Sequence, residues 1–445
     1  MIFRGDPAAE AGRRSHERHV ADTQPPPPER LSSTELRDLC LAHGADDVGF
    51  VEADRPALGP PQHAAAQRLL PGARTLIALV GALHRDTIAS PPRSVANAGF
   101  HHDGERLRDT TGDIARALAT RGVKAVVTTV GFPMEVGRIA TEPIWEIAHK
   151  VVAVEAGLGH MGINRNVIHP RFGNFVLLDT LVIDTEVDAY DTPLDYNPCA
   201  DCNLCVAVCP VGAISRKEPF DFFACMNHNY REFMFGFSNW ADSLAAAGSS
   251  AEYRTKFRED ETISMWQSLS SGPHYKSAYC MAVCPAGDDV IGPYLQDRKA
   301  YVDTYVRPLK DQVEPVYVQS GTHAETVAAR NPAKDLRYID FAVGVAGVDN
   351  AIRGLQHMFD RRRGLVADGT TILCVVDEAH EIVLTVERGA LRRVDSGEPT
   401  ATARGPLTAW MAVLTHAAAG SPVVPDDLLV TGDAAAFDAL LRSLR

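Results

Sequence analysis

Four cysteines with short, regular spacing are the residues of this sequence best suited to metal chemistry. They follow the pattern C-x2-C-x2-C-x3-C and are Cys199, Cys202, Cys205 and Cys209, with Pro210 directly after the last. This spacing lets one tight loop present three thiolates to a single cubane iron–sulfur cluster, while the fourth cysteine ligates a second cluster. Structural zinc sites use paired C-x2-4-C knuckles instead. The run therefore predicts iron–sulfur clusters rather than zinc.

The second cluster must draw its ligands from the other clustered cysteines. Seven of the nine cysteines lie between positions 199 and 284, and the last two form a C-x3-C-P run. By the crossing usual for two-cluster modules, the first [4Fe-4S] cluster takes Cys199, Cys202, Cys205 and Cys284. The second cluster takes Cys209, Cys225 and Cys280. The isolated Cys40 and Cys374 are expected to be buried core residues, because small thiols behave as hydrophobes.

The second cluster lacks a fourth thiolate. Ser277 stands three residues before Cys280, where a full motif would carry a cysteine. Three alternatives remain open: a [3Fe-4S] cluster, a [4Fe-4S] cluster completed by Ser277, His228 or His274, and a [4Fe-4S] cluster with an open iron.

The elements that position these residues are predicted from hydrophobic periodicity. A helix is expected to begin at Ser32, which stands three residues before Glu35 in a capping-box spacing, and to end at Gly44. Strands and helices then alternate as far as residue 190. The expected ranges are strands at 48–51, 76–80, 125–130 and 174–183, and helices at 105–121 and 142–155.

The chain is expected to be a multidomain α+β protein. A polar, proline-rich leader covers 1–30, an α/β domain covers 31–190, and the cysteine module covers 191–305. A linker is expected over 306–335, followed by a separate α+β domain at 336–445. In this last domain a helix at 349–360, strands at 372–376 and 382–387, and helices at 406–418 and 434–441 are predicted.

A glycine-rich stretch before the cysteines resembles a known superfamily. Ala156-Gly157-Leu158-Gly159-His160-Met161-Gly162, then Ile168-His169-Pro170-Arg171-Phe172-Gly173, lead by a strand into the cysteine run. This order is similar to the cobalamin-dependent reductases, which comprise the epoxyqueuosine reductases and the reductive dehalogenases. The resemblance implies a nitroreductase-like first domain, a bacterial-ferredoxin-like two-cluster module, and a bound cobalamin. It also implies that Gly157, Gly159, His160 and Gly162 approach the corrinoid.

The proton donor of these reductases has no matching position in this sequence. Thr141 and Glu142 lie near the place where epoxyqueuosine reductases carry an aspartate, but the spacing to the glycine loop differs. By chemistry alone, the catalytic candidates are Glu142, His160 and Tyr230, because carboxylates, imidazoles and phenols can transfer protons.

The last hundred residues resemble a sterol-carrier-protein-type lipid-binding domain. The resemblance rests on a helix, a strand pair through Leu373-Cys374-Val375-Val376 and Ile382–Val386, and the ending Leu429-Val430-Thr431-Gly432-Asp433 before a final helix. Such folds hold an apolar tunnel between a sheet and helices, although a packing module without a ligand is the alternative.

Charge and hydropathy argue against some classes of function. Acidic residues outnumber basic ones by 57 to 44, giving a net charge of -13, which argues against a nucleic-acid partner. No apolar run is long enough to span a membrane, and no secretory signal precedes the clustered cysteines, so a cytoplasmic location is expected.

The leading hypothesis is an oxidoreductase, a cobalamin- and cluster-dependent reductase of a small apolar electrophile. It would act by dehalogenation or by removal of an epoxide or other oxygen substituent. Ferredoxin or flavodoxin would be the external electron donor. The alternatives are a non-catalytic electron-transfer or redox-sensing protein with a lipid-binding domain, and a tRNA epoxyqueuosine reductase-like enzyme.

Overall fold

The computed structural model describes most of the chain between residues 28 and 444. The described ranges are 28–134, 145–199, 202–217, 220–233, 236–274, 278–320, 322–339, 348–360, 365–418 and 423–444, together with Arg14 and Arg363. Three predictions lie outside the described residues: most of the leader at 1–30, the catalytic candidate Glu142, and Ser277 as a cluster ligand.

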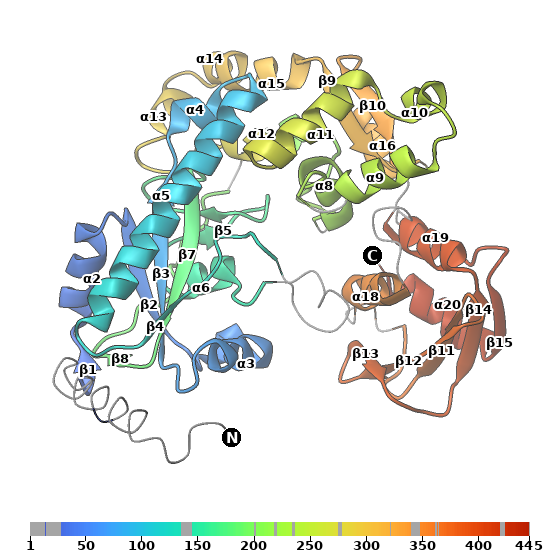
Figure 1. Ribbon diagram of the computed structural model, residues 1–445, viewed down its shortest axis with the longest axis horizontal. Coiled ribbons are helices and arrows are strands. Elements are labelled where there is room, and N and C mark those ends of the chain that lie inside the picture. Colours follow the sequence, from blue (N-terminus) through green and yellow to red (C-terminus); the bar gives the residue numbers. More distant parts are fainter. Residues whose placement is uncertain are drawn as a thin grey trace.

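A four-stranded antiparallel sheet forms the centre of the N-terminal part (Figure 1). Its strand order is β2 (Asp47–Glu52), β3 (Thr75–Ala82), β7 (Val176–Ile183) and β4 (Ala125–Val127). Helices cover both faces of the sheet. On one face, α2 (Ser33–Ala42) and α5 (Arg93–Ala119) share an apolar core with the strands. On the other face, α3 (Pro60–Leu69) and α6 (His149–Glu155) share a second core with them. Burial on both faces explains why β3 and β7 are nearly continuous apolar runs.

Several local predictions for this part are confirmed. The Ser32 hydroxyl caps α2 by accepting a hydrogen bond from the Glu35 amide at 3.3 Å, and Cys40 is fully buried. Gly44 follows the helix with a φ of 102°. Helix α5 begins at Arg93 rather than at residue 105, with Pro92 at its N-cap position. Residues 145–148, expected to be helical, are not, and α6 begins at His149.

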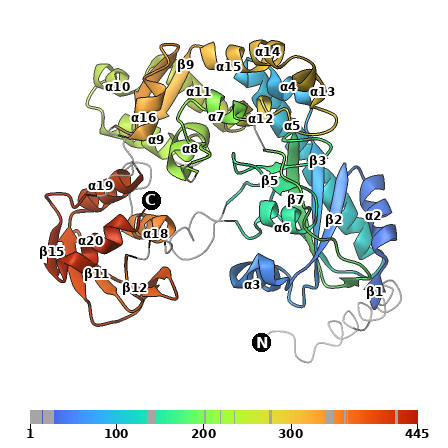
Figure 2. The same cartoon turned by 180° about the vertical axis from the view of Figure 1, so that it is seen from behind.

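The cysteine module consists of short helices between the two sheet-containing parts (Figure 2). These are α7 (Leu204–Val208), α8 (Phe222–Asn229), α9 (Gly236–Ala246), α10 (Ser250–Lys256), α11 (Glu259–Ser271), α12 (Ala278–Ala282), α13 (Gly292–Gln296) and α14 (Arg298–Tyr301). Helix α12 places Met281 in a common core with Ile88 of α4 (Arg85–Ala89) and Phe175. The module is therefore packed directly against the N-terminal part.

Residues 306–335, expected to be a linker, are ordered instead. After a π-helical turn at Val302–Val306 they form α15 (Arg307–Asp311), β9 (Glu314–Val318), α16 (His323–Ala328) and the start of β10 (Lys334–Tyr338). The two strands pair in parallel, with Val316 opposite Leu336. The prediction was wrong because these strands are too short for a clear periodicity and Pro315 argued against a strand. Their apolar side packs over the cysteine module.

The C-terminal part contains a five-stranded sheet with the order β13 (Ala390–Val394), β12 (His380–Glu387), β11 (Thr371–Val376), β14 (Ala401–Gly405) and β15 (Leu429–Gly432). Helices α18 (Val348–Met358), α19 (Leu407–Ala418) and α20 (Ala434–Arg442) complete one core around Trp410 and Phe437. The predicted helices and the β11–β12 pair are confirmed. Strands β13, β14 and β15 were not predicted, because each has few buried apolar residues. The likeness to a sterol-carrier-type domain stays a prediction.

The C-terminal core includes a residue of the cysteine module. Met226 of α8 is buried among the side chains of α18, α19 and α20, and Tyr230 packs against the same core. Since Cys225 directly precedes Met226, α8 joins a predicted cluster ligand to the C-terminal part.

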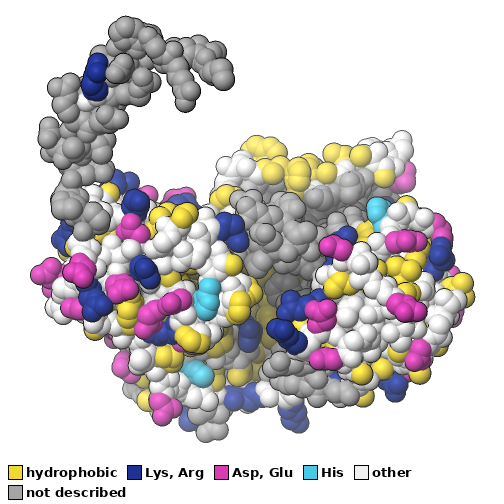
Figure 3. Space-filling model, turned by 90° about the horizontal axis from the view of Figure 1, so that it is seen from below, with side chains coloured by type: hydrophobic (Ala, Val, Ile, Leu, Met, Phe, Trp, Pro, Cys, Tyr) yellow, Lys and Arg dark blue, Asp and Glu magenta, His cyan; other side chains and the backbone are white. Residues whose placement is uncertain are grey.

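The surface shows no separation of charge on the face in Figure 3. Acidic and basic side chains are interspersed there over both sheet-containing parts. Among the described residues, no helix is long and apolar enough to cross a membrane.

Candidate active site

A backbone contact holds the second cysteine run against the end of the N-terminal sheet. The amides of Asp288 and Asp289 donate to the carbonyl oxygens of Pro170 and Arg171 at 2.9 and 3.0 Å. Gly173, with a φ of 62°, is so close that an added Cβ would lie 1.7 Å from the Ala286 oxygen. Only glycine fits at such a contact, because any side chain would overlap backbone atoms.

The first predicted ligand group is held together in the structure. The Cys205 thiol interacts electrostatically with those of Cys199, Cys202 and Cys284, and also with that of Cys280. Burial, reinforced by these neighbours, raises the pKa of Cys205, and burial raises the pKa of Cys284 to about 12. The Arg216 guanidinium donates to the carbonyl oxygens of Cys199 and Cys202, which fixes the loop between them.

The second group lies deeper in the protein. Burial raises the pKa of Cys280 to about 12, and the Cys209 thiol adds to the rise. Burial followed by the thiols of Cys280 and Cys209 also raises the pKa of Cys225. The Cys209 sulfur accepts a hydrogen bond from the Ala213 amide at 3.3 Å, and the Asn229 amide donates to the Cys225 sulfur at 3.6 Å.

This thiol arrangement fits iron–sulfur clusters. All seven cysteines are free of disulfides, although they are crowded in partly buried positions. Crowded thiols of this kind stay protonated unless positive iron compensates their charge, and amide N–H donors to sulfur are typical of cluster sites. In the described ranges, no group of three or more His, Cys, Asp or Glu side chains is arranged to hold a single metal ion. The assignment of each cysteine to a cluster stays a prediction.

The β9–α16–β10 unit packs over the second cysteine group and is called its cover below. Val316, Val318 and Ala324 pack with Val211 and Ala224, and this cluster contacts the side chains of Cys209 and Cys225. Such a cover excludes water from the thiols, which favours a low-dielectric cluster environment.

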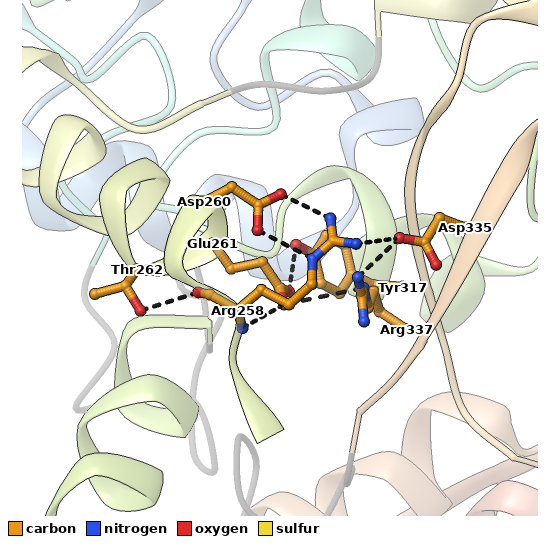
Figure 4. A network of polar contacts seen from close by, with 7 residues as sticks. All are labelled: Arg258, Asp260, Glu261, Thr262, Tyr317, Asp335 and Arg337. Carbon is orange, nitrogen blue, oxygen red and sulfur yellow. Dashed lines mark hydrogen bonds and ion pairs between the residues drawn. The ribbon is translucent and has the colours of Figure 1, made fainter. Parts of the chain in front are cut away.

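A polar network fixes the cover to the cysteine module (Figure 4). Arg258, at the start of α11, donates to Asp335 of β10 at 2.9 Å and to Asp260 at 2.7 Å. Glu261, nearly fully buried, accepts from the Tyr317 hydroxyl of β9 at 2.9 Å. The module and its cover are thus joined by charged groups from both sides.

The fourth ligand of the second group stays open among the three alternatives. His228 is buried, and its Nδ1 accepts a hydrogen bond from the Tyr317 amide at 3.4 Å. That nitrogen is therefore already used by the protein. The backbone amide of His274 donates to Glu232 at 3.0 Å, which positions the residue without defining the role of its ring.

Packing within the protein explains why glycines occupy the loop after α6. Gly157 follows α6 with a φ of 69°, and an added Cβ would lie 2.6 Å from the Thr192 oxygen. At Gly159 it would lie 2.5 Å from the Ile168 oxygen, and at Gly162 it would lie 2.7 Å from the Asn164 Oδ1. The glycines therefore allow a helix end and a close hairpin, a packing role that does not itself require a corrinoid. Corrinoid binding stays a prediction.

The described catalytic candidates lie in different elements. His160 is half-buried in β5 (His160–Met161), which pairs with β6 (Val167–Ile168). Tyr230 ends α8, and its ring lies edge-on to Phe233 at 6.3 Å. Their catalytic roles stay predictions, as do those of the corrinoid-contacting glycines.

Three polar residues near the second group were missed. The Asn164 side chain hydrogen-bonds to the Cys280 thiol, and the Asn174 amide donates to the Cys280 carbonyl at 3.2 Å. Lys150 interacts with the thiols of Cys280 and Cys225. None of them has a distinctive spacing to the cysteines. They come from separate segments of the N-terminal part that the fold brings near Cys280.

An aromatic stack joins the module to the N-terminal part. The Phe233 ring stacks on Phe132 at 4.2 Å and on His101 of α5 at 6.0 Å. Of the neighbouring aromatic residues, Phe220 packs beside the second cysteine group, whereas Phe237 is 43% exposed.

A buried carboxylate in the N-terminal sheet provides a pH-dependent test. Burial in the sheet outweighs His149 and the hydrogen bonds from Thr111, Thr180 and Thr128, so the pKa of Asp179 is raised. A carboxyl group whose pKa is higher in the folded than in the unfolded protein stabilises the fold at pH values below its unfolded-state pKa near 4. This stabilisation is lost as the pH rises through the pKa of the folded state. The Asp179→Asn variant has no carboxyl group at this position and should not lose this part of its stability as the pH rises.

The free energy of unfolding of Asp179→Asn, compared with that of the wild-type protein, should therefore increase as the pH rises. Urea unfolding of the anaerobic protein between pH 4 and 8 measures it. Parallel stability profiles for the two proteins would contradict the raised pKa.

Comparison with known proteins identifies relatives of the chain. It is 27% identical over 183 residues to epoxyqueuosine reductase from Bacillus cereus, covering 40% of this chain and 44% of that protein. It is 35% identical over 204 residues to the Staphylococcus aureus enzyme of the same name, covering 43% and 49%. The chain thus spans about half the length of the curated relatives it matches. No family model matches it.

The expectation that nucleic acid is not a partner is corrected by a solved relative. An epoxyqueuosine reductase bound to an epoxyqueuosine-modified tRNA-Tyr stem loop is 18% identical, with a TM-score of 0.29, and the match covers 45% of this chain and 60% of that one. The expectation rested on net charge, which sums over the whole surface and does not describe the local surface that meets a nucleic acid.

The relatives found by sequence bear the name to which the glycine loop and the cysteine run pointed. The chain is therefore similar to the epoxyqueuosine reductases over about 40% of its length.

Proposed function

We propose that the protein is a reductase that uses two iron–sulfur clusters and a corrinoid. We further propose that its substrate is an epoxyqueuosine-type nucleotide in a tRNA stem loop. The observation that carries the proposal is the grouping of seven free thiols into two neighbouring sets beside the glycine hairpin. The names of the curated relatives support the reaction class and the substrate.

Each part of the chain has a defined task in this proposal. Cys199, Cys202, Cys205 and Cys284 hold the first cluster, and Cys209, Cys225 and Cys280 hold three corners of the second. The β9–α16–β10 unit excludes water from the second set. When bound, the clusters supply single electrons and the corrinoid supplies a nucleophilic cobalt. Because packing within the protein already explains the glycines, the corrinoid is proposed on the similarity to epoxyqueuosine reductases alone.

The proton source is proposed to come from this chain. His160 lies in the glycine hairpin, and Tyr230 lies between the cysteine module and the C-terminal core. Either side chain can donate a proton as the oxygen substituent leaves. His160→Gln and Tyr230→Phe separate the two, because only the variant that lacks the donor should lose turnover while keeping its iron.

The proposed function is tested with anaerobically purified protein. Iron and cobalt are counted, the protein is reduced chemically, and an epoxyqueuosine-containing stem loop is added. Conversion of epoxyqueuosine to queuosine, measured by mass spectrometry as loss of one oxygen atom, is expected. An unmodified stem loop and the Cys202→Ala variant serve as controls. Unchanged epoxyqueuosine with fully metal-loaded protein would overturn the proposed substrate.

A further inference from the structure

Lys150 joins helix α6 to the tip of the glycine hairpin. Its ammonium donates to the Arg165 carbonyl at 2.8 Å and to the Asn166 Oδ1 at 3.0 Å. The tip is closed by the Gly162 amide, which donates to the Asn166 carbonyl at 2.8 Å, and it holds Arg165 at a φ of 63°. A non-glycine residue in this region is unfavourable by itself, so a bond to its carbonyl helps to hold the turn.

The same ammonium faces the second cysteine group. It interacts attractively with the thiols of Cys280 and Cys225, while Arg165 is the neighbouring positive charge that opposes it. The side chain reaches solvent. Desolvation by the surrounding protein lowers the pKa of Lys150, and the two thiols act against this change.

The hairpin reaches the second group at another point. The Asn164 side chain hydrogen-bonds to the Cys280 thiol, and the Asn166 amide donates to the Asn164 Oδ1 at 3.3 Å. Asn164 therefore links the hairpin tip to the Cys280 thiol, with which Lys150 also interacts electrostatically. Neither contact follows from the cysteine spacing.

We propose that Lys150 is a positioning residue for the second cluster, which holds the glycine hairpin beside it and offsets the negative charge of its thiolates. A positive charge near a cluster favours addition of an electron to that cluster. Lys150 thereby raises the reduction potential of the second cluster. The inference rests on the proposed function only for the presence of that cluster.

The test compares three variants of the full-length protein. Lys150→Met removes the charge at similar length, Lys150→Arg keeps the charge, and Asn166→Ala removes a hairpin bond while keeping the charge. Midpoint potentials of both clusters are measured by redox titration with electron paramagnetic resonance. Lys124→Met, at an exposed lysine before β4, is the matched control for loss of a positive charge.

Lys150→Met should shift the second-cluster midpoint to a more negative potential and leave the first unchanged. Lys150→Arg and Lys124→Met should keep both midpoints. Asn166→Ala should keep the midpoint but speed hydrogen exchange in residues 160–168. An unchanged midpoint in Lys150→Met, or an equal shift in Lys150→Arg, would overturn the proposal.

Loss of the second cluster is also informative. If Lys150→Met loses about four iron atoms while Lys150→Arg retains them, the charge is needed for the thiolate site, which supports the proposal. If both variants lose them, Lys150 acts only by packing and the proposal fails. The potentials are measured whether or not tRNA is reduced, so failure of the proposed substrate is distinguished from failure of this inference.

Discussion

Gly173→Ala should release the second cysteine run from the N-terminal sheet. The added Cβ would overlap the Ala286 carbonyl at 1.7 Å, and the backbone there has a φ of 62°. Neither partner can move easily, because the contact is between two backbones and hydrogen bonds from Asp288 and Asp289 hold it. We expect the free energy of unfolding to fall by about 3 kcal/mol or more, measured by urea titration of the iron-loaded protein.

Gly72→Ala is the matched control for this substitution. Gly72 has a similar φ of 87°, but an added Cβ would meet no atom within 4 Å. Its substitution should cost only the unfavourable backbone conformation, about 1 kcal/mol. If both variants lose the same stability, the contact between Gly173 and Ala286 is not what holds the two regions together.

Cys202→Ala should remove the first cluster while the N-terminal sheet stays folded. The Cys202 thiol belongs to the first group, and its predicted cluster shares no ligand with the two apolar cores of that sheet. Iron content should fall by about four atoms per chain, and reduction of the stem loop should fall to background. Iron analysis and far-ultraviolet circular dichroism measure the two effects separately.

The control for Cys202→Ala is a cysteine outside the cluster groups. Cys374 is fully buried in β11, and burial alone raises its pKa, as expected for a core thiol. Cys374→Ala should keep all the iron and lose only about 1 kcal/mol of stability. Loss of iron in this variant, or full retention of iron in Cys202→Ala, would contradict the ligand assignment.

Local physical chemistry made much of the fold predictable. The Ser32 cap, the buried faces of α2 and the apolar runs of β3 and β7 depend on residues that are close in sequence or repeat with a fixed period. Where the signal was weak, prediction failed. The short strands β9 and β10 alternate poorly and contain Pro315, so an ordered unit was taken for a linker.

The sequence by itself predicted the chemistry of the cysteines. Spacings of two and three residues bring thiols into one loop whatever surrounds them, so the cluster type could be predicted before any fold was known. The glycines were different. Their spacing indicated a cofactor loop, whereas the tertiary structure shows that Gly157, Gly159 and Gly162 avoid contact with the protein's own backbone and side chains.

Only the tertiary structure decided which residues surround the clusters. Lys150, Asn164 and Asn174 are more than 100 residues from Cys280 in sequence, and a hairpin and a helix bring them together. The contact of Met226 with the C-terminal core arises in the same way. Spacing reports only contacts within one turn or loop. Contacts between distant segments depend on how apolar faces pack, and that packing leaves no local pattern in the sequence.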